Sequence, residues 1–130
     1  MDKIIISGTG CALADFLYTD INFESPQFKK YCSVNPGDGG LSPGKLVFTE
    51  ELEKFASARY ADIIAEITED QEPETSNIGG NGIVPLIHAA QLLTEPCYEV
   101  KFYGGTGSDN TAMLIYDLLK QTPLDTTNFI

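Results

Sequence analysis

The alternation of apolar and polar positions predicts short strands separated by helices. Residues 3–7 form a β-branched apolar run that ends at a glycine, which is typical of a strand buried on both faces in a parallel sheet. Residues 98–103 alternate and predict a second strand, and residues 128–130 resemble the start of a third. Residues 83–93 are apolar on nearly every side, which predicts a buried helix.

Capping residues place two further helices. Thr49 is a suitable N-cap, and apolar side chains at helical spacing follow it as far as Ile67. Ser108 or Asp109 caps another helix, which Pro123 ends. Parallel strands joined by helices predict an α/β layered sheet with right-handed crossovers.

The segment at 15–48 has a less regular pattern. Turn-forming residues cluster at 35–40 and 42–44, and the strand-like residues 45–48 follow them. We therefore expect short strands and turns that project from the main sheet. Five acidic residues between positions 66 and 74 predict an exposed, charged loop.

Composition narrows the class of protein. The chain has 130 residues, 42% of them hydrophobic, which suits one domain with a core. Eight basic and nineteen acidic residues give a net charge of −11, so neither a nucleic acid nor a membrane surface is an expected partner. No apolar window is long enough for a transmembrane helix, and the N-terminal residues do not form a signal peptide.

The three cysteines are spaced too widely for a familiar motif. They lie at positions 11, 32 and 97, and the chain has a single histidine, His88. Neither a disulfide framework nor a Cys/His metal site is predicted, and the reducing cytoplasm is the expected location. His88 lies on the apolar helix and is expected to be packed and hydrogen-bonded rather than to bind a ligand.

Three glycine-rich turns, at 8–10, 79–82 and 104–107, adjoin the predicted elements. At the carboxyl ends of parallel strands such turns line a ligand crevice, because glycine lets the backbone approach a ligand. Each turn taken alone could equally be structural. With Asp15 and Asn81 nearby, the three together favour a polar small-molecule site.

Nucleotide-binding signatures fit the chain poorly. Residues 8–13 begin like a dinucleotide fingerprint but lack its third glycine. Residues 39–45 spell GxxxxGK, but Leu46 stands where a magnesium-binding hydroxyl belongs, and a strand rather than a helix is predicted there.

An ordered set of motifs resembles the N-terminal part of the ribokinase-like sugar and nucleoside kinases, which include the bacterial phosphofructokinase-B type. The adenosine-kinase-like branch is the most similar. The blocks that carry the resemblance are, in order, Gly8-x-Gly10-x-Ala12-Leu13-x-Asp15, Pro36-Gly37-Asp38, Leu41-x-Pro43-Gly44, Gly79-Gly80-Asn81-Gly82 and Gly104-x-x-Gly107-x-Asp109.

The resemblance implies an α/β, ribokinase-like layered sheet, mostly parallel, with helices on both faces and a small β lid. Residues 1–130 would be its substrate-side portion, incomplete at the C-terminus, with about 15–48 contributing to the lid. In this family a sugar hydroxyl accepts the γ-phosphoryl group of ATP. ATP and Mg²⁺ are therefore implied for the full-length parent, although not for this chain alone, and a homodimer through the lid is a further expectation.

The resemblance also assigns the site. Asp15 would accept hydrogen bonds from sugar hydroxyls, and Gly107 with Asp109 matches a structural turn that closes the site. The residues expected to contact a sugar or nucleoside are Asp15, Gly79, Gly80, Asn81 and Cys11.

Some positions depart from the family pattern. Cys11 and Val84 stand where the branch usually has asparagine, and Ala112 replaces a usual glycine, so we expect altered specificity or lost activity. The family's catalytic base lies in a late Gly-Ala-Gly-Asp motif that is absent here, so no catalytic residue is assigned and the chain alone is expected to be inactive. The alternatives are a non-catalytic sugar- or nucleoside-binding module and an unrelated nucleotide-binding α/β domain.

Overall fold

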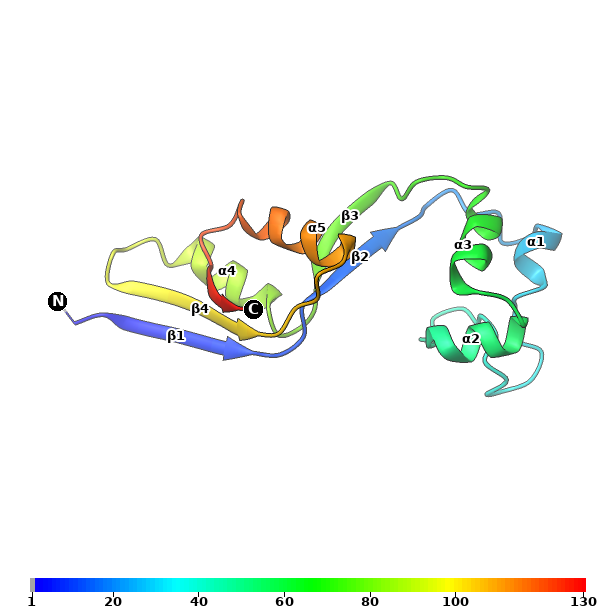
Figure 1. Ribbon diagram of the computed structural model, residues 1–130, viewed down its shortest axis with the longest axis horizontal. Helices are drawn as coiled ribbons and strands as arrows, with labels where there is room; N and C mark the ends of the chain where they lie inside the picture. The colour runs from blue at the N-terminus through cyan, green and yellow to red at the C-terminus, as the bar shows by residue number, and fades with distance from the viewer. Residues whose placement is uncertain (1) are drawn as a thin grey trace. The chain divides into compact units, whose positions relative to one another are not determined.

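The computed structural model describes residues 2–130 and divides the chain into two compact units (Figure 1). Unit 1 combines the N-terminal residues, as far as Phe16, with Thr75–Ile130, and unit 2 is Leu17–Glu74. Unit 2 includes most of residues 15–48, which are expected to contribute to a lid, and continues to Glu74. No helix within residues 2–130 is long and apolar enough to span a membrane.

Unit 1 contains a parallel sheet of three strands in the order β1-β4-β5. The strands are β1 (Ile4–Thr9), β4 (Tyr98–Gly104) and β5 (Asp125–Phe129), and their pairing confirms the predicted α/β class. The prediction that the first strand is buried on both faces is wrong. Because β1 is an edge of this sheet, Ile4 and Ile5 remain 50% and 57% exposed.

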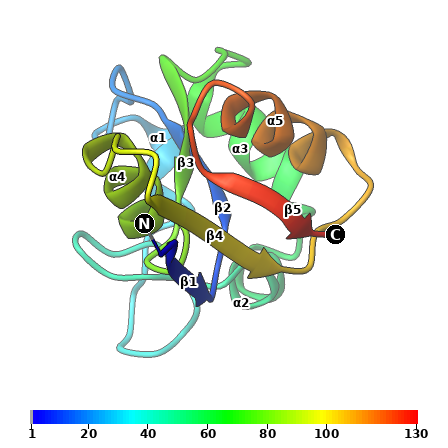
Figure 2. The ribbon, with the colours of Figure 1, turned by 90° about the vertical axis from the view of Figure 1, so that its left-hand side faces the viewer.

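The core of unit 1 lies between this sheet and two helices, α4 (Val84–Leu92) and α5 (Asn110–Leu119). Val100 and Phe102, which point to one face of β4, pack with residues of both helices. The connections from β1 to β4 and from β4 to β5 cross the sheet in the same direction. If both have the same hand, α4 and α5 must lie on the same face of the sheet, as Figure 2 shows. Within this unit the helices therefore cover one face rather than two.

A two-stranded antiparallel ribbon forms from β2 (Leu13–Leu17) and β3 (Thr75–Gly79). The backbone N–H of Glu74 donates to the carbonyl of Leu17 at 2.8 Å, which continues the ribbon past β3. The sequence did not predict β3, because its Thr-Ser-Asn-Ile-Gly residues follow the acidic segment and carry little apolar alternation. Helix α5 packs against β3, which ties the ribbon to the core of this unit.

Unit 2 is helical, with α1 (Pro26–Lys29), α2 (Thr49–Ala56) and α3 (Tyr60–Thr68). Its core is built on Tyr31, Leu52 and Ile63. The strand predicted at 45–48 does not form, and its residues lead irregularly into α2. The long helix predicted from Thr49 is two helices, because Ser57 adopts a left-handed conformation with φ of 51°.

The predicted acidic loop is partly structured. Glu66 lies in α3, where its carboxylate pairs with Lys30 and accepts a hydrogen bond from the Tyr31 hydroxyl at 2.6 Å. These two donors lower the pKa of Glu66, while burial, followed by the bond to Glu66, raises the pKa of Tyr31. Glu66 is thus paired with Lys30 and with the core residue Tyr31 rather than lying free in solvent.

Candidate functional site

The carboxylate of Asp15 lies directly over Gly79. Asp15 is an exposed residue of β2, and Gly79 is the buried last residue of β3. A Cβ atom built on Gly79 would collide with this carboxylate, with Cγ of Asp15 only 2.5 Å away. Position 79 must therefore lack a side chain for the Asp15 carboxylate to lie there, and the carboxylate lies against the backbone of β3.

The turn after β3 packs backbone to backbone against the turn after β1. A Cβ atom on Gly80, whose φ is 109°, would lie 2.5 Å from the carbonyl oxygen of Cys11. A Cβ atom on Gly82 would lie 2.6 Å from Cα of Gly10. The structure thus brings together two of the three predicted glycine turns.

A side-chain hydrogen bond also joins these two turns. The thiol of Cys11 donates to Oδ1 of Asn81 at 3.0 Å, and the backbone N–H of Ile83 donates to the Cys11 carbonyl at 3.3 Å. Cys11 and Asn81 are both exposed. The arrangement presents a carboxylate acceptor and a carboxamide on glycine-lined backbone, which is chemistry that suits the hydroxyl groups of a polar ligand.

Asp109 stands at the start of α5, two residues after Gly107. Asp109 is the N-cap, and its Oδ1 accepts the backbone N–H of Ala112 at 2.8 Å. Across residues 2–130, no hydrogen bond links either residue to Asp15 or Asn81.

The third glycine turn is explained by core packing. A Cβ atom on Gly104 would lie 2.7 Å from the ring of Phe102 and 3.3 Å from that of Phe129. The backbone of Thr106 donates to the carbonyl of Ile130 at 3.0 Å. These contacts close the end of the sheet, so the turn has a structural use that does not require a ligand.

The structure shows where His88 and the GxxxxGK segment, the two weaker signatures in the sequence, lie. His88 is exposed on α4, so the expectation that it is packed is wrong. In the GxxxxGK segment, a Cβ atom on Gly39 would lie 2.8 Å from the carbonyl oxygen of Glu51, and Leu46 is 82% exposed outside any helix. The part of the chain that the structure describes contains no group of three or more His, Cys, Asp or Glu side chains that could hold a metal ion.

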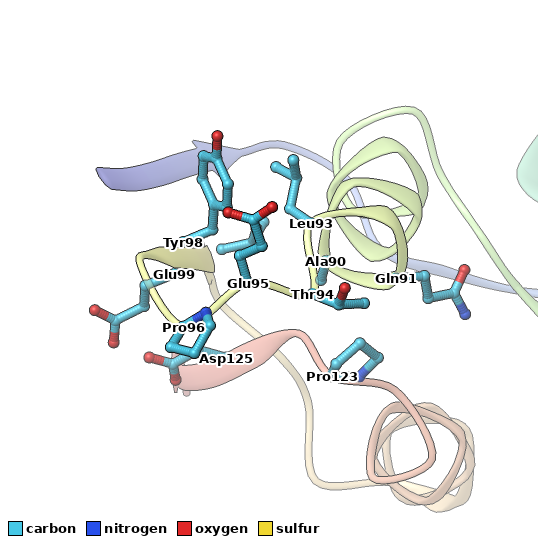
Figure 3. Close-up of a pocket in the computed structure, with 11 residues that line it drawn as sticks. Ala90, Gln91, Leu93, Thr94, Glu95, Pro96, Tyr98, Glu99, Pro123 and Asp125 are labelled. Carbon is cyan, nitrogen blue, oxygen red and sulfur yellow. The ribbon is translucent and has the colours of Figure 1, made fainter. Parts of the chain in front are cut away.

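Sequence reasoning missed a shallow cleft of about 420 Å³ at the amino-terminal end of β4 (Figure 3). The end of α4 forms one side of it, and Glu99 and Asp125 lie on the other. Lys101 pairs with both carboxylates, at 2.9 Å from Glu99 and 3.3 Å from Asp125, and Lys3 pairs with Glu99 at 3.0 Å. No glycine turn marks this cleft in the sequence, and it lies at the end of the sheet away from the usual ligand crevice.

Fold and site together define an α/β protein in which the Asp15 carboxylate lies over Gly79 and the Asn81 carboxamide joins two glycine turns that pack together. Comparison with protein-family models, curated proteins and solved structures found no match to the chain.

Proposed function

We propose that this chain forms the substrate-binding portion of a ribokinase-like kinase that transfers the γ-phosphoryl group of ATP to a hydroxyl of a sugar or nucleoside. The observation that carries the proposal is the carboxylate of Asp15 lying over Gly79, beside the turn that holds Gly80 and Asn81. The ordered motifs that resemble this family are the second support.

The binding chemistry follows from the groups in the cluster. The two oxygens of the Asp15 carboxylate can accept hydrogen bonds from two neighbouring hydroxyls of a sugar. Gly79 and Gly80 leave room for the ring of the ligand to approach the backbone. Asn81, oriented by the thiol of Cys11, adds a carboxamide at the edge of the site. A site built to pair hydroxyls discriminates strongly against ligands that lack them.

This chain's own residues bind and orient the substrate, and the proposal assigns catalysis to none of them. ATP and Mg²⁺ belong to the proposed whole kinase. The residues present do not fit either group: residues 46–48, directly after the GxxxxGK segment, are not helical, and among the residues described no acidic cluster could hold a metal ion. We therefore derive no phosphoryl-transfer step from this chain.

The experiment is a calorimetric titration of the chain with pentoses, hexoses and nucleosides. We expect saturable binding of at least one of them, and weakening of about tenfold or more in Asp15→Asn, because a charged hydrogen-bond acceptor is lost. Asp2→Asn, which removes an exposed carboxylate at the N-terminus, is the matched control. Gly79→Ala should also weaken binding, because its Cβ takes the space of the carboxylate.

The results separate the alternatives. Equal affinity in Asp15→Asn and the wild type would remove Asp15 from the site. No binding of any sugar or nucleoside would overturn the proposal, and binding of a dinucleotide alone would favour a nucleotide-binding domain. Sugar binding combined with no kinase activity in the protein isolated from its source would favour a non-catalytic module.

A cytoplasmic location and a homodimer through the lid expected at about 15–48, most of which lies in unit 2, are part of the same proposal. Several large apolar side chains of this unit are exposed, including Phe23 at 61%, Leu46 at 82% and Phe48 at 59%. Apolar surface of this kind is typical of association sites when it is contiguous. Sedimentation equilibrium, comparing the wild type with Leu46→Ser, tests the proposed homodimer. A wild type that is monomeric at all concentrations would exclude it.

A further inference from the structure

We propose that Asn81 is a site of spontaneous deamidation, which converts the carboxamide at the junction of the two glycine turns into a carboxylate. The chain has six asparagines, and Asn81 is the one that precedes a glycine. The reaction requires no ligand, so it does not depend on the function proposed above.

The local structure supplies what the reaction needs. The side chain of Asn81 is exposed, in a turn between β3 and α4 rather than inside either element. Gly82 carries no side chain to shield its backbone nitrogen from the Asn81 amide carbon. Among residues 2–130 no hydrogen-bond acceptor holds the Gly82 N–H, whereas the neighbouring Ile83 donates to Cys11.

The thiol of Cys11 favours the same reaction. It donates a hydrogen bond to Oδ1 of Asn81 at 3.0 Å. A donor at this oxygen withdraws electron density from the amide carbon and stabilises the negative charge that develops on the oxygen as the carbon is attacked. Cys11 therefore acts as a positioning and polarising residue, and it stays unchanged by the reaction.

The chemistry balances with water as the only co-reactant. The deprotonated backbone nitrogen of Gly82 attacks Cγ of Asn81, a carbon–nitrogen bond forms, and the side-chain nitrogen leaves as ammonia after taking up a proton. The product is a five-membered succinimide. Water then adds to one of its two carbonyl carbons, and the ring opens to aspartate or to isoaspartate, with one new negative charge in either case.

The two products have different structural consequences. Aspartate keeps the backbone of the turn and places a second carboxylate near the Cys11 thiol. Isoaspartate lengthens the backbone by one carbon next to Gly82, where even a Cβ atom would lie 2.6 Å from Cα of Gly10. We therefore expect the isoaspartate form to lose this backbone contact and to unfold more readily than the aspartate form.

Asp38, like Asn81, is followed by a glycine, and its contacts show why geometry matters. Asp38 precedes Gly39, but its carboxylate accepts three backbone N–H bonds, from Val34, Asn35 and Gly40, at 2.7, 2.8 and 3.0 Å. These bonds hold the carboxyl carbon in place, so isomerisation there requires opening of the loop.

The experiment incubates the folded chain at mildly alkaline pH and follows each asparagine by peptide mass spectrometry. We expect Asn81 to convert about tenfold or more faster than each of the other five, the ratio produced by a barrier lower by about 1.4 kcal/mol. Ion-exchange chromatography should show a more acidic species in the wild type and much less of it in Asn81→Gln, whose longer side chain cyclises slowly.

Two cysteine variants test whether the Cys11 thiol accelerates the deamidation of Asn81. Cys11→Ala should slow the conversion by about threefold, the loss expected for one hydrogen bond. Cys97→Ala, which removes the thiol near Glu95, should leave the rate unchanged. An Asn81 rate no higher than that of the other asparagines overturns the site, and an undiminished rate in Cys11→Ala overturns the role of the thiol.

Discussion

Replacement of Gly82 by alanine should destabilise unit 1 through steric collision with the backbone of the facing turn. The added Cβ would lie 2.6 Å from Cα of Gly10 and 2.7 Å from the backbone nitrogen of Cys11. Carbon atoms in ordinary contact are about 3.5–4.0 Å apart, so the two turns must separate by about 1 Å. Both colliding atoms belong to the backbone, so no side-chain rotation can relieve the collision.

The expected magnitude is about 3 kcal/mol. Overpacking a tight contact costs about 1–3 kcal/mol, and separation of the turns also weakens the hydrogen bond from Ile83 to Cys11, worth about 1 kcal/mol. Domains of this size have free energies of unfolding of about 5–15 kcal/mol, so the loss is a substantial share of the total. The melting temperature should fall by about 10 °C.

The assay is urea denaturation followed by far-ultraviolet circular dichroism, with Gly105→Ala as the matched control. Neither glycine has a positive φ, so neither substitution strains the backbone itself. At Gly105 the nearest atom to a Cβ is the carbonyl oxygen of Ile130, at 3.7 Å, which is ordinary contact. Equal midpoints for the two variants would refute the argument, because the close approach of the turns would then have no energetic weight.

Two further predictions concern other parts of the chain. Phe102→Ala should cost about 3–5 kcal/mol, because Phe102 is completely buried in the core of unit 1, and a loss below 1 kcal/mol in chemical denaturation would place the core elsewhere. Three backbone N–H bonds lower the pKa of Asp38 to about 2, so the folded loop at 34–40 is favoured above the ordinary pKa of 3.8 and loses that support as the pH falls towards 2. The amide resonance of Gly40 should shift over that interval in the wild type but not in Asp38→Asn, and the same shift in both would contradict this assignment.

Local signals in the sequence predicted several elements correctly. The apolar run at 83–93 and the alternation at 98–103 correspond to α4 and β4. Asp109 caps α5 as predicted, because a cap depends on one side chain and the N–H groups that follow it. Such signals act over a few residues, so they can be recognised without knowledge of the fold.

The sequence named the residues of the candidate site but not their arrangement. The motifs singled out Asp15, Gly79, Gly80, Asn81 and Cys11, and the structure brings these residues together. The support of the Asp15 carboxylate by Gly79 could not be predicted, because it depends on the pairing of β2 with β3, which the sequence left unrecognised. The third glycine turn was included for its composition, and only the packing of Gly104 against Phe102 shows its structural use.

The sequence by itself determined the order of most strands and helices, the acidic net charge and the residues able to form a polar site. Only the tertiary structure decided that β1 is an edge strand, that both helices of unit 1 cover one face, and that Gly82 meets Gly10. The physical reason is the distance along the chain over which each effect acts. Propensity and capping act between neighbours in the chain, whereas exposure and backbone contact are decided by segments far apart in the chain that meet only when it has folded.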